Sequence, residues 1–236
     1  MIYSMTYYPR VDDYDLNSRL SYTSMLEVLQ SAMIAHSLSI GDAVRSGDIG
    51  WVLVDWMVRI IRRPLLNETL EIKTWSAENL SETMALREFE VFARNSGEML
   101  IQASAKMCQL NMKTAQVEKL DPKLADIYKP EKRVLFGDRN RRIAIPEQFD
   151  EVKPVIIRRN DFDFNHHVNN PKYLEYVTEC LPEELWQQEF GNLRVIYHSS
   201  VRRNQMLNML VRYDDDTVTM ILNADDHLAA IFELRK

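Results

Sequence analysis

The chain has 236 residues, of which 46% are hydrophobic, and this is enough to bury a sizeable core in one or two domains. A net charge of −6 argues against a general nucleic-acid-binding surface, and two cysteines do not make a disulfide framework, so we expect a reduced, cytoplasmic protein. The N-terminal stretch lacks the pattern of a signal peptide, and we expect no membrane span because no uncharged apolar run is long enough.

The first half of the chain predicts a strand, a long helix and then four strands. Residues 2–8 have strand-like composition, and apolar residues at helical spacing predict a helix within residues 18–40, with Gly41 as its stop. Val52, Val54, Trp56, Val58 and Ile60 alternate along the first of the later strands and are expected to share one face. The four later strands are expected at residues 51–61, 69–75, 82–93 and 99–110.

The second half repeats this order. A short strand is expected at residues 155–159 and a helix from residue 170 to about 190, broken or kinked at Pro182. Four more strands are expected at residues 193–201, 206–213, 217–223 and 228–234. The stretch between the halves is richer in proline and charge and predicts a surface linker. We therefore predict an α+β fold with an N-terminal half at residues 1–120, a linker at 121–153 and a C-terminal half at 154–236.

A short segment of the first half also recurs in the second. Residues 14–27 align without gaps with residues 162–175, and Asp, Asn, Leu and Glu coincide. Arg19 stands where His167 stands in the second copy. A duplication in which only the second copy kept the imidazole explains this pattern, and its long period indicates two similar halves rather than a solenoid.

The second copy carries side chains suited to chemistry. Asp163, Asn165 and His167 alternate, so an extended backbone would point all three to one side. Asn170 and Pro171 predict a helix start, with asparagine as the cap and proline in the first turn. A carboxylate, a carboxamide and an imidazole beside free backbone N–H groups could supply a base, an orienting partner and oxyanion donors for attack on a carbonyl.

The pattern of these residues resembles a motif of a known protein family. The resemblance also extends to Arg63-Pro64 and to the segment Glu71-Ile-Lys-Thr74-Trp75. The element order resembles a double hotdog fold, with two tandem halves that each wrap a curled antiparallel sheet around a long helix. The segment from Asp163 to Tyr173 resembles the active-site signature of acyl-acyl carrier protein thioesterases. It reads Asp163-x-Asn165-x-His167-Val168-Asn169-Asn170-x-x-Tyr173. The resemblance implies a hydrolase of fatty acid biosynthesis that cleaves the thioester between a fatty acyl chain and the phosphopantetheine arm of acyl carrier protein.

The resemblance also implies roles for single residues in the C-terminal half, while the N-terminal half would supply the acyl-binding pocket. His167 would activate or hydrogen-bond the attacking water, Asn165 would orient the reacting groups, and Asp163 would support the site. A thioester has a good leaving group, so no cofactor and no metal are expected. The family has a glutamate on the strand after the second helix, and Ser200 occupies that position here.

Several residues could replace the missing glutamate. Glu175 or Glu179 on the helix, or the side chain of Ser200 or His198, could take its place. The absence of the glutamate also leaves open a catalytically silent acyl-binding protein of the same fold, and an acyl-coenzyme A thioesterase is a further alternative. A dehydratase is favoured less, because the polar trio resembles the hydrolase signature.

Three further alternatives concern residues outside the trio. Asp163 and Asn165 could be simple turn residues, and His166, His167 and His198 could be metal ligands, although adjacent residues of an extended chain point opposite ways. Two fused halves satisfy hotdog pairing internally, but a homodimer stays open. Basic residues that could dock the acidic carrier protein are Arg158, Arg159, Lys172, Arg202 and Arg203.

Overall fold

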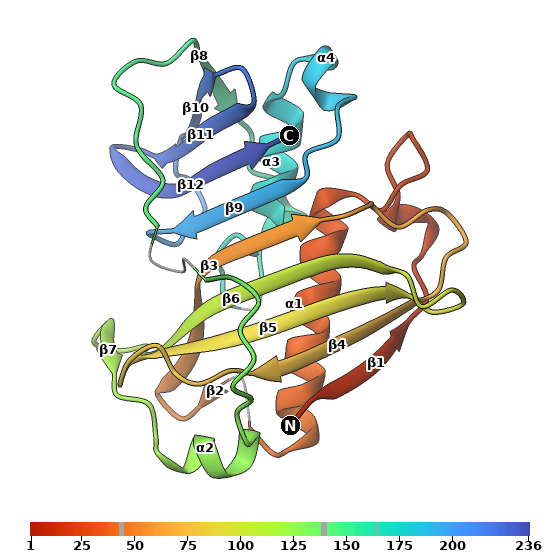
Figure 1. Cartoon of the computed structure of the whole chain (residues 1–236). Helices are drawn as coiled ribbons and strands as arrows, with labels where there is room; N and C mark the ends of the chain where they lie inside the picture. Colours follow the sequence, from red (N-terminus) through yellow and green to blue (C-terminus); the bar gives the residue numbers. More distant parts are fainter. Residues whose placement is uncertain (43–44, 138–140, 164) are drawn as a thin grey trace. The chain divides into compact units, whose positions relative to one another are not determined.

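The computed structural model describes residues 1–42, 45–137, 141–163 and 165–236, so Phe164 of the repeated segment lies outside the described residues (Figure 1). The fold is α+β, with antiparallel strands and few helices, as the sequence predicts. The chain divides into two compact units, Met1–Arg139 (unit 1) and Asn140–Lys236 (unit 2). Within the described ranges, the helices are all too short or too polar to cross a membrane.

Unit 1 contains one long helix and an antiparallel sheet with the strand order β1-β4-β5-β6-β3 (Figure 1). Short strands extend it, because β2 pairs with β3 and β7 pairs with β6. The predicted helix and strands of this half are confirmed to within a few residues at each end. The elements are β1 (Tyr3–Tyr7), α1 (Tyr22–Ser39), β2 (Arg45–Ser46), β3 (Ile49–Ile60), β4 (Leu70–Ser76), β5 (Met84–Ala93), β6 (Met99–Asn111), β7 (Gln116–Glu118) and α2 (Lys123–Tyr128).

Helix α1 begins and ends at residues suited to those positions. The hydroxyl of Ser21 accepts the backbone N–H of Ser24 at 3.0 Å, which satisfies one of the free donors of the first turn. Gly41 follows the helix with a φ of +79°, a conformation that glycine adopts without steric cost. The helix packs on the sheet through a row of buried residues that includes Met25 and Leu29, each contributing roughly 1.5–3 kcal/mol by burial.

The face predicted for β3 is correct only at its C-terminal end. The pairing of β3 with β6 shifts register between Leu53 and Asp55, so Val54 is the extra residue of a β-bulge. Before the bulge Leu53 is buried, whereas after it Trp56 and Val58 are buried. The strict alternation expected from residue 52 to residue 60 therefore changes phase at the bulge.

Unit 2 is smaller, and its antiparallel sheet has the strand order β9-β12-β11-β10-β8 (Figure 1). The helix predicted to break at Pro182 is two helices, which this proline separates. The last four predicted strands are confirmed with small shifts of their ends. The elements are β8 (Glu151–Val155), α3 (Lys172–Cys180), α4 (Glu183–Trp186), β9 (Asn192–Tyr197), β10 (Leu207–Tyr213), β11 (Thr217–Ala224) and β12 (His227–Arg235).

The strand expected at residues 155–159 is wrong in position. The strand found there is β8, which ends at Val155, and Arg159 belongs to a 3₁₀ turn over Arg159–Asp161. Pro154 lies inside β8. The sequence alone places this proline at the end of the linker, so the predicted strand begins after it. β8 is the last strand of the sheet order, a position where a proline removes no ladder bond from a central strand. The segment predicted as a linker also contains α2.

Candidate functional site

The segment that carries the predicted catalytic trio is a closed loop rather than an extended strand. The backbone N–H of Asp163 donates to the carbonyl of His167 at 2.8 Å, and the N–H of His166 donates to the carbonyl of Asp163 at 3.1 Å. His166 has a φ of +60°, in the left-handed region. The expectation that three side chains point one way along an extended chain is therefore wrong, because the aspartate favours a turn over an extended backbone.

The carboxylate of Asp163 organises this loop from inside. Its Oδ1 accepts the backbone N–H of Asn165 at 2.8 Å and that of His167 at 3.2 Å. Its Oδ2 lies 3.4 Å from the side-chain Nδ2 of Asn165. The bonds of the carboxylate therefore go to the loop backbone and to the carboxamide, and we find none from it to the imidazole among the described residues.

His167 combines partial burial with a ring available for chemistry. Burial lowers the pKa of this histidine below its ordinary value, and the nearby Arg202 charge lowers it further, while Asp163 opposes both. We find no hydrogen bond from the imidazole to another described residue. A largely neutral imidazole with an available nitrogen near pH 7 is what a general base requires.

A second loop lies beside this one. His167 pairs with Arg202 in an isolated antiparallel bridge, and the N–H of Val168 donates to the carbonyl of Val201 at 3.0 Å. Ser200, which the sequence resemblance predicts to stand in the family's glutamate position, precedes Val201 in this second loop and is exposed. The structure thus brings the loop of Ser200 alongside the loop of His167.

Two tyrosines, buried Tyr173 and half-buried Tyr197, hold these loops in place. The hydroxyl of Tyr173 accepts the N–H of Val201 at 3.1 Å, and the hydroxyl of Tyr197 donates to the carbonyl of Asn170 at 3.0 Å. Their rings contact edge to face, with centroids 5.4 Å apart. Burial raises the pKa of Tyr173 to about 12 and that of Tyr197 well above its ordinary value, so both are neutral phenols. Sequence reasoning used both residues only to align the motif and missed these contacts.

The start of the second helix differs from its prediction. Helix α3 begins at Lys172, and Pro171 is the residue before it, with no side-chain cap from Asn170. The first backbone N–H groups, at residues 172–174, already donate to the carbonyls of residues 169–171. Between residues 168 and 174, within the described structure, Asn170 has the one backbone N–H that donates to no other residue. The expected oxyanion donors are thus reduced to this group.

A buried aspartate just before the loop also supports the site. Asp161 accepts the backbone N–H of Arg158 at 2.7 Å and the hydroxyl of Tyr176 at 2.6 Å. Burial acts to raise the pKa of this carboxyl, but these hydrogen bonds together with the Arg158 charge hold it below its ordinary value. Sequence reasoning did not find this residue. The signal was present, because an arginine three residues before an aspartate also occurs at Arg10 and Asp13, at the spacing of the repeat.

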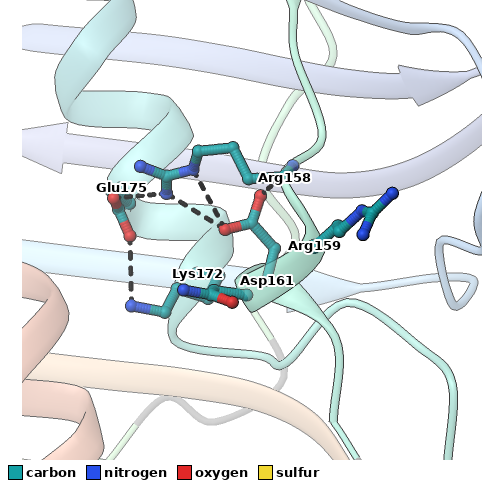
Figure 2. A pocket seen from close by; sticks show the side chains of 6 residues that line it. Arg158, Arg159, Asp161, Lys172 and Glu175 are labelled. Carbon is teal, nitrogen blue, oxygen red and sulfur yellow. Dashed lines mark hydrogen bonds and ion pairs between the residues drawn. The ribbon is translucent and has the colours of Figure 1, made fainter.

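The residues that flank the loop line an open pocket of roughly 400 Å³ (Figure 2). Arg158 forms ion pairs with Asp161 and Glu175, and the ammonium of Lys172 lies 3.2 Å from a carboxylate oxygen of Glu175. In Figure 2 the side chain of Arg159 points away from this network. The pocket is lined by Arg158, Arg159, Asn160, Asp161, Lys172 and Glu175, so three cations face two carboxylates.

The other candidates from the sequence lie elsewhere. Glu175 is committed to the ion pairs of the pocket, and Glu179 and His198 are exposed. Cys108 and Cys180 are buried free cysteines whose thiol pKa values are raised by burial, which disfavours the thiolate. No group of three His, Cys, Asp or Glu side chains suited to a metal ion occurs among the residues that the structure describes.

Two family models match this chain. The model described as the acyl-ACP thioesterase N-terminal domain matches residues 1–128, and that of the acyl-ACP thioesterase C-terminal domain matches residues 146–231. The acyl-[acyl-carrier-protein] hydrolase FATB3 of Cuphea viscosissima, named as chloroplastic, is 26% identical over 209 residues, covering 82% of this chain and 50% of its own length. The oleoyl-acyl carrier protein thioesterase of Coriandrum sativum, also chloroplastic, is 23% identical over 261 residues and covers 99% of this chain and 69% of itself.

Solved structures share the fold over nearly the whole chain. The 12:0-ACP thioesterase from Umbellularia californica superposes with a TM-score of 0.89 at 19% identity, covering 99% of this chain and 96% of that one. An acyl-ACP thioesterase from Bacteroides thetaiotaomicron superposes with a TM-score of 0.87 at 17% identity, covering 99% and 97%. The chain spans half the length of the FATB3 hydrolase that it matches.

Proposed function

Because the chain belongs to the acyl-ACP thioesterase family, we propose that it hydrolyses the thioester between a fatty acyl chain and the phosphopantetheine arm of acyl carrier protein. The observation that carries this proposal is the half-buried, uncharged His167 in a loop that also holds Asn165 and Asp163. The names of the relatives describe hydrolysis of such esters. In this proposal residues 1–120 and 154–236 are two tandem hotdog halves, each with a helix and a curled antiparallel sheet, and the predicted linker at residues 121–153 joins them.

The proposed mechanism uses one base and no covalent intermediate on the protein. The imidazole of His167 takes a proton from water as the water oxygen attacks the thioester carbonyl carbon. The carboxamide of Asn165 and the backbone N–H of Asn170 are the donors available to the oxyanion that forms. Collapse of this intermediate breaks the carbon–sulfur bond, and the imidazolium returns the proton to the departing thiolate. The products are a free fatty acid and the carrier thiol.

The missing glutamate sets the electrostatics of this site. Ser200 brings no charge to the glutamate position, and Glu175 is held by Arg158 and Lys172. The charges that influence the pKa of His167 are Arg202, which lowers it, Asp163, which raises it, and His166, which lowers it by a smaller amount. We propose that the base works with a lowered pKa, which keeps it deprotonated at neutral pH but makes it a weaker proton acceptor.

The pocket beside the loop suits an acidic partner. The three cations of the pocket outnumber its two carboxylates, and Arg159 points away from the ion pairs, while acyl carrier protein brings a phosphate on its arm (Figure 2). We propose that the carrier docks here and that the protein acts in fatty acid biosynthesis in the cytoplasm. The cytoplasmic compartment is proposed from the cysteine usage alone. The relatives from plants are named as chloroplastic, so they do not support it. A homodimer is also kept as a proposal.

A second candidate function is an acyl-binding protein without turnover. The observation that favours it is Ser200, which is exposed and uncharged where the family has a glutamate. An acyl-coenzyme A thioesterase differs from the first proposal only in its leaving group.

One assay separates these functions. Release of free thiol is measured from acyl-acyl carrier proteins of several chain lengths and from the matching acyl-coenzyme A esters. Faster turnover of the carrier-protein esters, lost in His167→Ala, is the expected result. His166→Asn is the matched control, because His166 is exposed and asparagine tolerates its positive φ. Bound fatty acid without turnover of either ester would favour the acyl-binding protein.

A further inference from the structure

The loop of residues 15–19 in unit 1 repeats the hydrogen bonds of the loop of residues 163–167 in unit 2. The Oδ1 of Asp15 accepts the N–H of Asn17 at 2.9 Å and that of Arg19 at 3.1 Å. The N–H of Asp15 donates to the carbonyl of Arg19 at 2.9 Å. The residue three positions after the aspartate has a positive φ in both loops. The two aspartates are therefore equivalent in structure as well as in sequence.

Each loop also pairs with a second segment, and the pairings match position by position. In each unit one backbone N–H of the loop donates to a carbonyl of the second segment, at 2.8 Å in unit 1 and 3.0 Å in unit 2. In each unit the neighbouring residue pair forms an isolated antiparallel bridge. The pairs are Leu20 with Pro64 and Arg19 with Leu65 in unit 1, and Val168 with Val201 and His167 with Arg202 in unit 2. One residue further back in each second segment, Arg63 corresponds to Ser200.

The side chains at this position differ sharply. Arg63 is buried, and its Nη1 lies 2.5 Å from the Oδ2 of Asp15. Its guanidinium also stacks over the ring of Tyr22, 4.8 Å from the centroid. Ser200 is exposed and too short to reach Asp163 in the same way. The outer oxygen of Asp163 has instead a 3.4 Å contact with its neighbouring carboxamide.

We propose that the side chain at position 200 decides whether this loop is open to substrate, and that Arg63 seals the first copy of the site. In unit 1 the guanidinium occupies the place beside the aspartate Oδ2. In unit 2 the serine leaves that place to the attacking water and the thioester carbonyl. This inference rests on the proposed function, since it assigns the open place to the reactants of that reaction.

The proposal gives Ser200 a role that does not depend on acid chemistry. A long cation is excluded at this position because it would pair with Asp163, as Arg63 pairs with Asp15. Ser200 is then a positioning residue, which keeps the space open. The Oδ2 of Asp163, equivalent to the oxygen of Asp15 that Arg63 covers, accepts only the 3.4 Å contact from Asn165 and can also accept a hydrogen bond from the attacking water.

The test introduces the seal into unit 2. Ser200→Arg is expected to lower kcat/KM by at least about 100-fold, the scale of losing a general base, without lowering the melting temperature. The matched control is Ser199→Arg, which adds the same charge one residue away at an exposed position and is expected to stay within about threefold of the parent. Unchanged activity in Ser200→Arg would overturn the proposal, and so would equal losses in both variants.

A second readout does not depend on turnover. The crystal structure of Ser200→Arg is expected to show the guanidinium on the Oδ2 of Asp163, and the nuclear magnetic resonance titration of His167 is expected to shift to lower pH because a cation is added nearby. A guanidinium directed into solvent and an unshifted titration would contradict the sealing even if the parent protein had no thioesterase activity. An inactive parent with a sealed variant would contradict the proposed function alone.

Discussion

The two loops compared above share one backbone design but differ in what their side chains leave available. In unit 1 Arg63 closes the loop with a buried ion pair to Asp15, and Arg19 stands in place of an imidazole. In unit 2 the equivalent positions hold Ser200 and His167. The hydrogen bonds that shape the loop are retained in both, so the loop itself is a structural unit. The comparison shows that the same set of loop hydrogen bonds forms with different side chains at these two positions, so the proposed difference in function lies in the side chains and not in the backbone.

The strongest test of this comparison removes the imidazole. We expect His167→Ala to lower kcat/KM by about 10²–10⁴-fold, because the proton of the attacking water then has no acceptor. Arg19→Ala, the substitution at the matching position of unit 1, should leave turnover within a few-fold of the parent. Thiol release under subsaturating substrate measures both. Equal losses in the two variants would remove the distinction between the loops.

The second test breaks the seal of unit 1. Arg63→Ser leaves the carboxylate of Asp15 without its buried partner, and we expect the free energy of unfolding to fall by about 3 kcal/mol. Ser200→Ala in unit 2 removes only an exposed hydroxyl and should change it by less than about 0.5 kcal/mol. Urea unfolding followed by circular dichroism compares the two. A small loss in Arg63→Ser would show that the ion pair contributes little to the frame.

A third prediction concerns a buried histidine in unit 1. The Nδ1 of His36 lies 2.6 Å from a guanidinium nitrogen of Arg87, which can only donate, so the proton of the neutral ring is on Nε2. Burial, and then the charge of Arg87, lower the pKa of His36 from 6.5 to about 4. Its Nε2 is buried, with no hydrogen-bond partner among the described residues.

The sign of the resulting pH dependence follows from this shift. Between pH 6.5 and about 4 the unfolded chain binds a proton at His36 and the folded chain does not. The free energy of unfolding should therefore be highest above pH 6.5 and fall by up to about 3 kcal/mol as the pH drops toward 4. Unfolding midpoints measured across this range should show a shallower slope in His36→Gln than in the parent. His198→Ala, at an exposed position, should keep the parent slope, and a slope that survives in His36→Gln would contradict the assignment.

The smallest expected effect is a change in the pH profile of turnover. Arg202 is one of the charges that lower the pKa of His167, so Arg202→Ala should raise that pKa. Because the deprotonated ring is the base, the acid limb of the kcat/KM profile should move to higher pH in this variant. Arg203→Ala, one residue further along, is the control for the loss of surface charge. If the acid limb does not move, the ionisation that produces it belongs to a group other than His167.

Much of the fold could be predicted from the sequence. Apolar periodicity located α1 and the strands of unit 1, and Gly41 and Pro182 marked helix ends that the structure confirms. The family resemblance drawn from the motif around His167 is confirmed by both family models. These features depend on residues close together in sequence, where local sterics and burial leave few choices.

The errors have equally local causes. Alternation from Asp163 to His167 resembled a strand, but the aspartate side chain bonds to the loop backbone and folds the segment into a turn. The position predicted for β8 is wrong because a proline usually argues against a strand, whereas Pro154 lies in a strand at the edge of the sheet order, where proline is tolerated. In β3 the bulge at Val54 changed the buried face, which no periodic pattern records.

The sequence by itself determined the two-part plan, the repeated loop and the types of side chain on it, because these follow from local patterns and from direct comparison of two segments. The tertiary structure alone decided which of those side chains are available. Arg63 lies 48 residues from Asp15, and Tyr173 lies 28 residues from the Val201 N–H that it accepts, so neither contact has a local signal. Whether an arginine reaches such a carboxylate depends on the pairing of two loops far apart in sequence, and only the folded chain sets that.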